Sequence, residues 1–214
     1  MSSNPHSHIH KCEDEGKNYE TPQMIEIAKE MTDNIKQWIN LSRDSIILDF
    51  GTGTGLIGLN FIEEVKKVIF EDVSENMLNY LKEKLKNKNV KNYEIFLGEI
   101  QNYKTEEKID LITAGLVIHH VENLQNLFKS FFNLLRPKGY LCLSDLKKNA
   151  PMFDLNGPKH KMPHRGFDQE ELCDELKKTG FIKTEIKPAS NIVFHSKEGK
   201  KIISERFIIL AQRP

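Results

Sequence analysis

The sequence predicts an α/β protein with a doubly wound, mostly parallel sheet and helices on both faces. Two observations support this prediction. Short, almost wholly apolar runs such as residues 45–50 recur along the chain, and such strands are usually buried on both faces of a parallel sheet. Segments whose apolar residues have helical spacing alternate with these runs, as in successive β-α-β units.

The first 40 residues divide into two parts. Residues 1–18 are polar and without periodicity, so we expect a mobile tail that precedes one domain at 19–214. The tail's alternating His6, His8 and His10 are not accompanied by a second ligand cluster, so no metal site is predicted. A Thr-Pro pair at residue 21 is typical of a helix start, and helical spacing continues to residue 40.

The remaining elements follow in chain order. The expected strands are 45–50, 67–72, 93–98, 108–115 and 139–146, and the expected helices between them are 56–66, 74–87 and 122–136. Asp168, three residues before a glutamate, is expected to cap a further helix that ends at Gly180. Two strands, 181–187 and 204–212, are expected to close the chain.

The composition narrows the class of protein. Lysine plus arginine and aspartate plus glutamate number 31 each, so the zero net charge argues against nucleic acid as a partner. No apolar run approaches the roughly 18 residues that a membrane span needs, and no apolar signal region is present. Three widely separated cysteines indicate reduced thiols. We therefore expect a cytoplasmic protein.

A glycine-rich stretch, LDFGTGTGLIGLNF at 48–61, follows the first strand. Gly53, Gly55 and Gly58 match G-x-G-x-x-G, which by itself indicates only a nucleotide-like ligand. Asp49 would repel a pyrophosphate but would stabilise an ammonium or sulfonium group. Asp72, about twenty residues on, is placed to accept the hydroxyls of a ribose. The alternatives are a turn-stabilising role for Asp49 and a solvated helix start for Asp72.

Acidic residues end several of the expected strands. Asp49, Glu71 with Asp72, Glu99 and Asp145 lie where the carboxyl ends of parallel strands form a ligand crevice. This acidic edge favours a cationic nucleoside over a dinucleotide.

Two further features bear on the chemistry. His119 and His120 follow the fourth strand, where either could take a proton from an acceptor. The alternative is that one histidine packs and the other only lines the pocket.

Residues 147–165 form a long, cation-rich connection that could bind a small acceptor with an apolar body and an anionic group. The alternative is that its charges are solvated.

The ordered motifs ILDFGTGTGLIGL, FEDVSENML, LGEI and KIDLITAGLVIHHVENLQNLFKSFFNLLRPKGYLCLSDL resemble the Rossmann-like S-adenosylmethionine-dependent methyltransferases. The likeness is to the small-molecule branch with a histidine pair after the fourth strand, and it covers about 46–146. GFDQEELCDELKKTGF is similar to the family's last helix. Lys138, where the family often has glycine, and Glu99, where aspartate is commoner, are the departures.

The resemblance implies a seven-stranded sheet whose last strand runs antiparallel, and S-adenosylmethionine as cofactor. In the family this region often folds over the cofactor, so the resemblance makes helix 19–40 a possible lid with Tyr19 at the junction; the alternative is that the helix simply packs at the edge. The implied cofactor-binding residues are Asp49, Gly51, Gly53 and Gly55 at the methionine and ribose, Asp72 at the ribose hydroxyls, Val73, Met77, Gly98, Glu99 and Ile100 around the adenine, and Leu116 beneath the reactive end.

We therefore predict a methyltransferase that moves a methyl group from S-adenosylmethionine to a small-molecule acceptor. A nicotinamide-dependent oxidoreductase on the same fold and a non-catalytic cofactor-binding module are the alternatives. The identity of the acceptor and the oligomeric state are left open.

Overall fold

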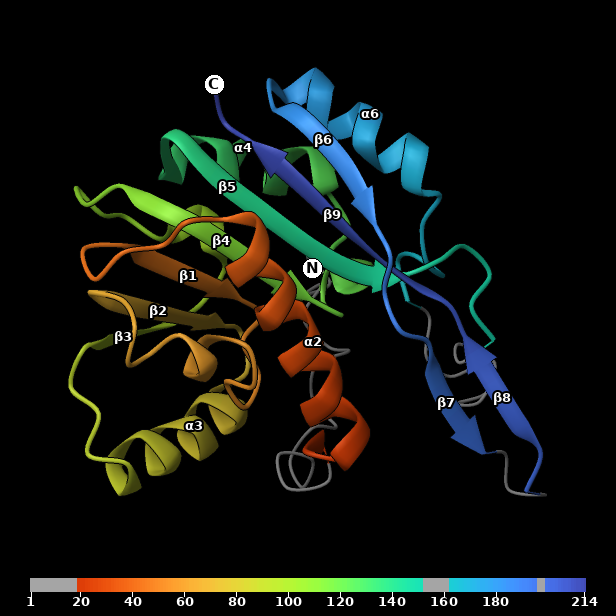
Figure 1. Cartoon of the computed structure of the whole chain (residues 1–214), viewed down its shortest axis with the longest axis horizontal. Helices are drawn as coiled ribbons and strands as arrows, with labels where there is room; N and C mark the ends of the chain where they lie inside the picture. Colours follow the sequence, from red (N-terminus) through yellow and green to blue (C-terminus); the bar gives the residue numbers. More distant parts are fainter. Residues whose placement is uncertain (1–18, 152–161, 196–198) are drawn as a thin grey trace, which may run out of the picture.

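A seven-stranded sheet with the strand order β3-β2-β1-β4-β5-β9-β6 forms the centre of the protein (Figure 1). The computed structural model describes residues 19–151, 162–195 and 199–214, so the N-terminal tail lies outside the described residues. Strands β1 to β5 pair in parallel, and β9 runs antiparallel to both β5 and β6. The predicted fold class, including the antiparallel last strand, is confirmed. The strands are β1 (Ile46–Phe50), β2 (Lys67–Asp72), β3 (Tyr93–Leu97), β4 (Ile109–Gly115), β5 (Leu135–Leu146), β6 (Ile182–Lys187) and β9 (Arg206–Gln212).

Helices cover both faces of this sheet and bury it. Helices α2 (Pro22–Trp38) and α3 (Glu75–Asn87) share an apolar cluster with Ile47 of β1. Helices α4 (Leu124–Leu134) and α6 (Gln169–Thr179) share a second cluster with Leu48, the next residue of β1. Because successive strand residues point to opposite faces, a wholly apolar strand requires this double cover.

The predicted helix boundaries have identifiable chemical causes. Thr21 caps α2 by accepting from the Met24 amide at 3.2 Å. Asp168 accepts from two amides at the start of α6, and Gly180 ends that helix with a left-handed φ of 114°. These ends were predicted from the cap residues and are confirmed.

The prediction of a helix at 56–66 is wrong. The segment holds only the short 3-10 helix η2 (Gly58–Asn60) within a series of turns. Side chains take up the backbone groups that an α-helix would use: the Gly58 amide donates to Asp49, and the Asn92 amide group donates to the carbonyls of Ile62 and Val65. Competition of this kind favours turns over a helical ladder.

Two other predictions need correction. Strand β5 begins at Leu135, not at residue 139, and α4 correspondingly ends at Leu134. An antiparallel hairpin of β7 (Ile192–His195) and β8 (Lys201–Ser204) was not predicted. It projects beyond the sheet on the side of α2 (Figure 1), and its strands of four residues are too short to show a period.

None of the helices in the described parts of the chain combines the length and apolarity that crossing a membrane would require.

Candidate active site

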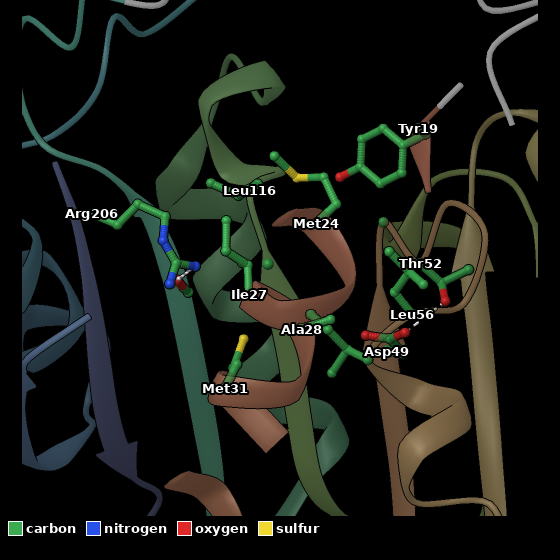
Figure 2. A pocket seen from close by; sticks show the side chains of 14 residues that line it. Tyr19, Met24, Ile27, Ala28, Met31, Asp49, Thr52, Leu56, Leu116 and Arg206 are labelled. Carbon is green, nitrogen blue, oxygen red and sulfur yellow. Dashed lines mark hydrogen bonds between the residues drawn. The ribbon is translucent and has the colours of Figure 1, made fainter. Parts of the chain in front are cut away.

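A pocket that is partly open to solvent lies at the carboxyl ends of β1, β4 and β5 beneath the first half of α2. In Figure 2, Arg206 and Leu116 come from one wall, Asp49 and Thr52 from the opposite wall, and α2 passes between them. The lining residues are Tyr19, Met24, Ile27, Ala28, Met31, Asp49, Gly51, Thr52, Leu56, Ile57, Gly115, Leu116, Ser144 and Arg206. The pocket is therefore mostly apolar with a few polar groups, as small-molecule sites usually are.

Asp49 forms part of the pocket wall and also holds the turn that follows β1. Its Oδ2 accepts from the Thr52 hydroxyl at 2.6 Å and from the Gly58 amide at 3.0 Å, and its Oδ1 accepts from the Thr113 hydroxyl at 2.7 Å. Burial raises the pKa of this carboxyl, and these hydrogen bonds oppose the rise. The turn-stabilising role is thus present together with the position beside the pocket.

The glycine loop after Asp49 leaves space on one side. Gly51 and Gly53 have positive φ angles of 58° and 53°, which glycine adopts without strain. A Cβ on Gly53 would meet nothing within 4 Å, whereas one on Gly51 would lie 2.2 Å from a methyl carbon of Val117. A Cβ on Gly55 would lie 2.5 Å from Leu81. Gly51 and Gly55 are therefore required by packing, and Gly53 borders open space that a ligand can occupy.

Two carboxylates at the end of β2 hold this loop. Asp72 accepts from the Gly53 amide at 2.7 Å and from the Ser74 amide at 2.8 Å. Glu71 is buried and accepts from the Gly51 amide at 3.1 Å. Desolvation, with smaller contributions from Asp72 and Asp49, raises the pKa of Glu71 to about 8. The sequence placed Glu71 on the acidic edge but gave no sign that it contacts the loop.

Apolar side chains are exposed next to Asp72, where the resemblance places the adenine. Val73 is 43% exposed, and Leu97, which was not predicted, is 50% exposed. Gly98 donates to the Asp72 carbonyl at 3.0 Å and leads into Glu99. Of the other predicted residues, Met77 is half-buried on α3, whereas Ile100 is buried in the core.

The beginning of α2 is tied to the glycine loop. Lys84 donates to the Thr54 carbonyl at 2.8 Å and also forms an ion pair with Glu20. Tyr19 lines the pocket with 38% of its surface exposed. Desolvation of its hydroxyl, followed by Asp145, Asp72 and Asp49, raises the pKa of Tyr19 to about 12. The carboxylates at the ends of three strands thus all raise the pKa of this one pocket residue.

The histidine pair lies beside the pocket, and neither ring is among its described lining residues. His119 is buried, and its Nδ1 lies 2.8 Å from Asp145 Oδ1. His120 is exposed, with its ring centroid 4.2 Å from that of His119. Desolvation and then His119 lower the pKa of His120. His164 of the 147–165 connection reaches the same region, since its amide donates to the His119 carbonyl.

The two lysines at the start of the 147–165 connection face surface carboxylates. Lys147 pairs with Glu205 at 2.7 Å and Lys148 with Glu171 at 3.8 Å. Predicted acceptor contacts within 152–161 lie outside the described residues.

Arg206 is a pocket residue that sequence reasoning missed. It is 2% exposed, forms an ion pair with Glu30 of α2, and donates to the Ser190 carbonyl at 2.9 Å and the Ser144 hydroxyl at 3.2 Å. The available signal was a lone arginine at the start of the apolar run RFIIL, because a cation is rarely buried without partners.

Comparison with known proteins places the chain in a family. A family model described as a methyltransferase domain matches residues 41–205. An uncharacterised methyltransferase of Schizosaccharomyces pombe is 27% identical over 65% of this chain and 54% of its own length. A malonyl-[acyl-carrier protein] O-methyltransferase of Ilyobacter polytropus is 26% identical over 58% of this chain and 48% of its own. The chain thus spans about half the length of these curated relatives.

A solved structure supports the same fold. A SAM-dependent methyltransferase from Aquifex aeolicus superimposes with a TM-score of 0.68 over 94% of this chain and 97% of its own, at 21% identity. The chain belongs to the methyltransferase domain family, and it has the Rossmann-like fold of S-adenosylmethionine-dependent methyltransferases. The predicted family is confirmed, and the oxidoreductase alternative is not favoured.

Proposed function

We propose that this protein transfers a methyl group from S-adenosylmethionine to a small-molecule acceptor held in the pocket beneath α2. The observation that carries the proposal is the open space at Gly53, whose amide donates to the Asp72 carboxylate and whose neighbours Gly51 and Thr52 line a mostly apolar pocket. The family match and the solved relatives support the same assignment.

The residues around the glycine loop fit this cofactor. Asp72 keeps acceptor capacity for ribose hydroxyls beyond its two backbone bonds, and Val73 and Leu97 offer apolar surface for an adenine ring. Asp49 and the nearby Asp72 are the carboxyls that would stabilise an ammonium or sulfonium group, and such a cation would in turn oppose the rise in the pKa of Asp49 that burial causes. Gly51, Gly55, Met77, Gly98, Glu99, Ile100 and Leu116 complete the proposed binding set.

The bound cofactor supplies an electrophilic methyl group for an in-line displacement. The protein must position the acceptor and exclude water, and the lid position of α2 above the pocket suits both tasks. His119 and His120 remain the proposed bases for an acceptor that must lose a proton. Asp145 holds the Nδ1 side of His119, which directs its Nε2 away from that carboxylate. The lowered pKa of His120 leaves its ring neutral near pH 7 but makes it a weaker base than a histidine of ordinary pKa, so His119 is the better placed of the two.

Calorimetry with S-adenosylhomocysteine and with NAD(H) tests the proposal. We expect binding of the former, weakened by about 1 to 3 kcal/mol in Asp72→Ala, the usual effect of losing a charged hydrogen-bond acceptor. Asp49→Asn should also weaken it, and Asp44→Ala, at an exposed position, is the control. Unchanged affinity in both site variants with an intact fold would show that the site is misplaced. Binding without turnover over a broad acceptor panel would favour a non-catalytic module.

A further inference from the structure

We propose that the acceptor has an apolar body and no negative charge, and that it binds between the first half of α2, Leu116 and the β7–β8 hairpin. The inference rests on the proposed function and assigns the class of acceptor and an acceptor-recognition role for the hairpin.

The pocket borders an apolar cluster to which the hairpin contributes. Ile27 of α2 and Leu146 of β5 are buried with Ile192 of β7, and partly buried Met24 and Phe194 pack against them. Met24 and Ile27 also line the pocket. The hairpin is thereby in contact with the wall that an acceptor would touch. Flexible methionine and aromatic side chains suit an apolar ligand of irregular shape.

Hydrogen bonds fix the hairpin to α2. The Val193 amide of β7 donates to the Gln23 side chain at 2.8 Å, and the amide of Ser190, two residues before β7, donates to Glu30 at 2.8 Å. Helix α2 and the β7–β8 hairpin are therefore held in a fixed relative position by hydrogen bonds near both ends of their contact.

The charges around the pocket disfavour an anion. Arg206 is the cation among the described lining residues, and Glu30 already offsets its charge. Its other described bonds go to Ser190 and Ser144. Asp49 lies on the opposite wall (Figure 2). An anionic acceptor would have to displace Glu30 or remain desolvated near a carboxylate, and both are costly.

A matched pair of probes tests the charge. Binding of 2-naphthol and of 2-naphthoate, which have the same ring system, is measured by ligand-observed NMR titration with S-adenosylhomocysteine held at saturation. We expect 2-naphthol to bind and 2-naphthoate to bind at least tenfold more weakly.

Two variants with matched controls test where the acceptor binds. Met24→Gln and Phe194→Ala should each weaken 2-naphthol binding at least fivefold without changing the affinity for S-adenosylhomocysteine. Ile25→Gln and Ile203→Ala are the controls, because Ile25 on α2 is 48% exposed and Ile203, on β8 of the same hairpin as Phe194, is 46% exposed. Met24→Gln is nearly isosteric, so it tests the site even if Phe194→Ala alters the hairpin.

The outcomes separate the two proposals. If the unmodified protein does not bind S-adenosylhomocysteine, the proposed function is overturned. Intact cofactor binding with equal or tighter 2-naphthoate binding, with no 2-naphthol binding, or with both site variants behaving like their controls would overturn the acceptor assignment alone.

Discussion

Replacing Glu71 by glutamine should make the protein more stable at neutral pH and should flatten its stability against pH. The side chain is 1% exposed, and burial raises its pKa from 4.5 to about 8. A carboxyl whose pKa is raised on folding holds a proton that the unfolded chain has released, so the folded state loses stability as pH rises between these two values.

The magnitude follows from the two pKa values. Between pH 5 and pH 7 the folded state keeps its proton on Glu71 while the unfolded chain loses most of its own, which costs about 2 to 3 kcal/mol of unfolding free energy. Glutamine can still accept from the Gly51 amide but does not titrate, so this part of the pH dependence should disappear.

Urea unfolding of both proteins at pH 5, 6, 7 and 8 provides the measurement. The difference in unfolding free energy between variant and parent should grow in favour of the variant up to about pH 8 and then level off. Glu63→Gln, at an exposed position, should follow the parent. Parallel curves for Glu71→Gln and the parent would refute the reasoning, since they would mean that Glu71 is ionised in the folded state across this range.

Three further predictions follow from the same geometry. Gly53→Ala should cost about 1 kcal/mol of stability because of its positive φ, and it should weaken S-adenosylhomocysteine binding by more than this. Gly51→Ala should mainly destabilise the fold, because its Cβ would overlap Val117. Thermal unfolding combined with calorimetry distinguishes the two variants. If α2 is a lid, S-adenosylhomocysteine should increase hydrogen-exchange protection in 19–40, and no added protection there would contradict this. Asp145→Asn should lower kcat with little change in cofactor affinity if His119 is the base; an unchanged kcat would assign the dyad to structure.

Much of the fold could be predicted because it depends on local patterns. The apolar run at β1 and the helical spacing in α3 and α4 each report burial directly. The Asp168 cap and the Gly180 end likewise depend on the chemistry of single residues. The prediction of a helix at 56–66 was wrong because side chains outside the segment, Asp49 before it and Asn92 thirty residues beyond Ile62, bond its backbone groups.

For the site, the sequence by itself determined which residue types stand at the carboxyl ends of the strands, because the alternation of elements brings those ends to one edge. The glycine loop with Asp49 and Asp72 was identified in this way. Only the tertiary structure decided which neighbours these groups meet. The Glu71 contact with Gly51, the burial of Arg206 against Glu30 and the hairpin beside α2 join segments 20 to 176 residues apart. Pairings of this range depend on how the layers pack, and no local period or spacing records them.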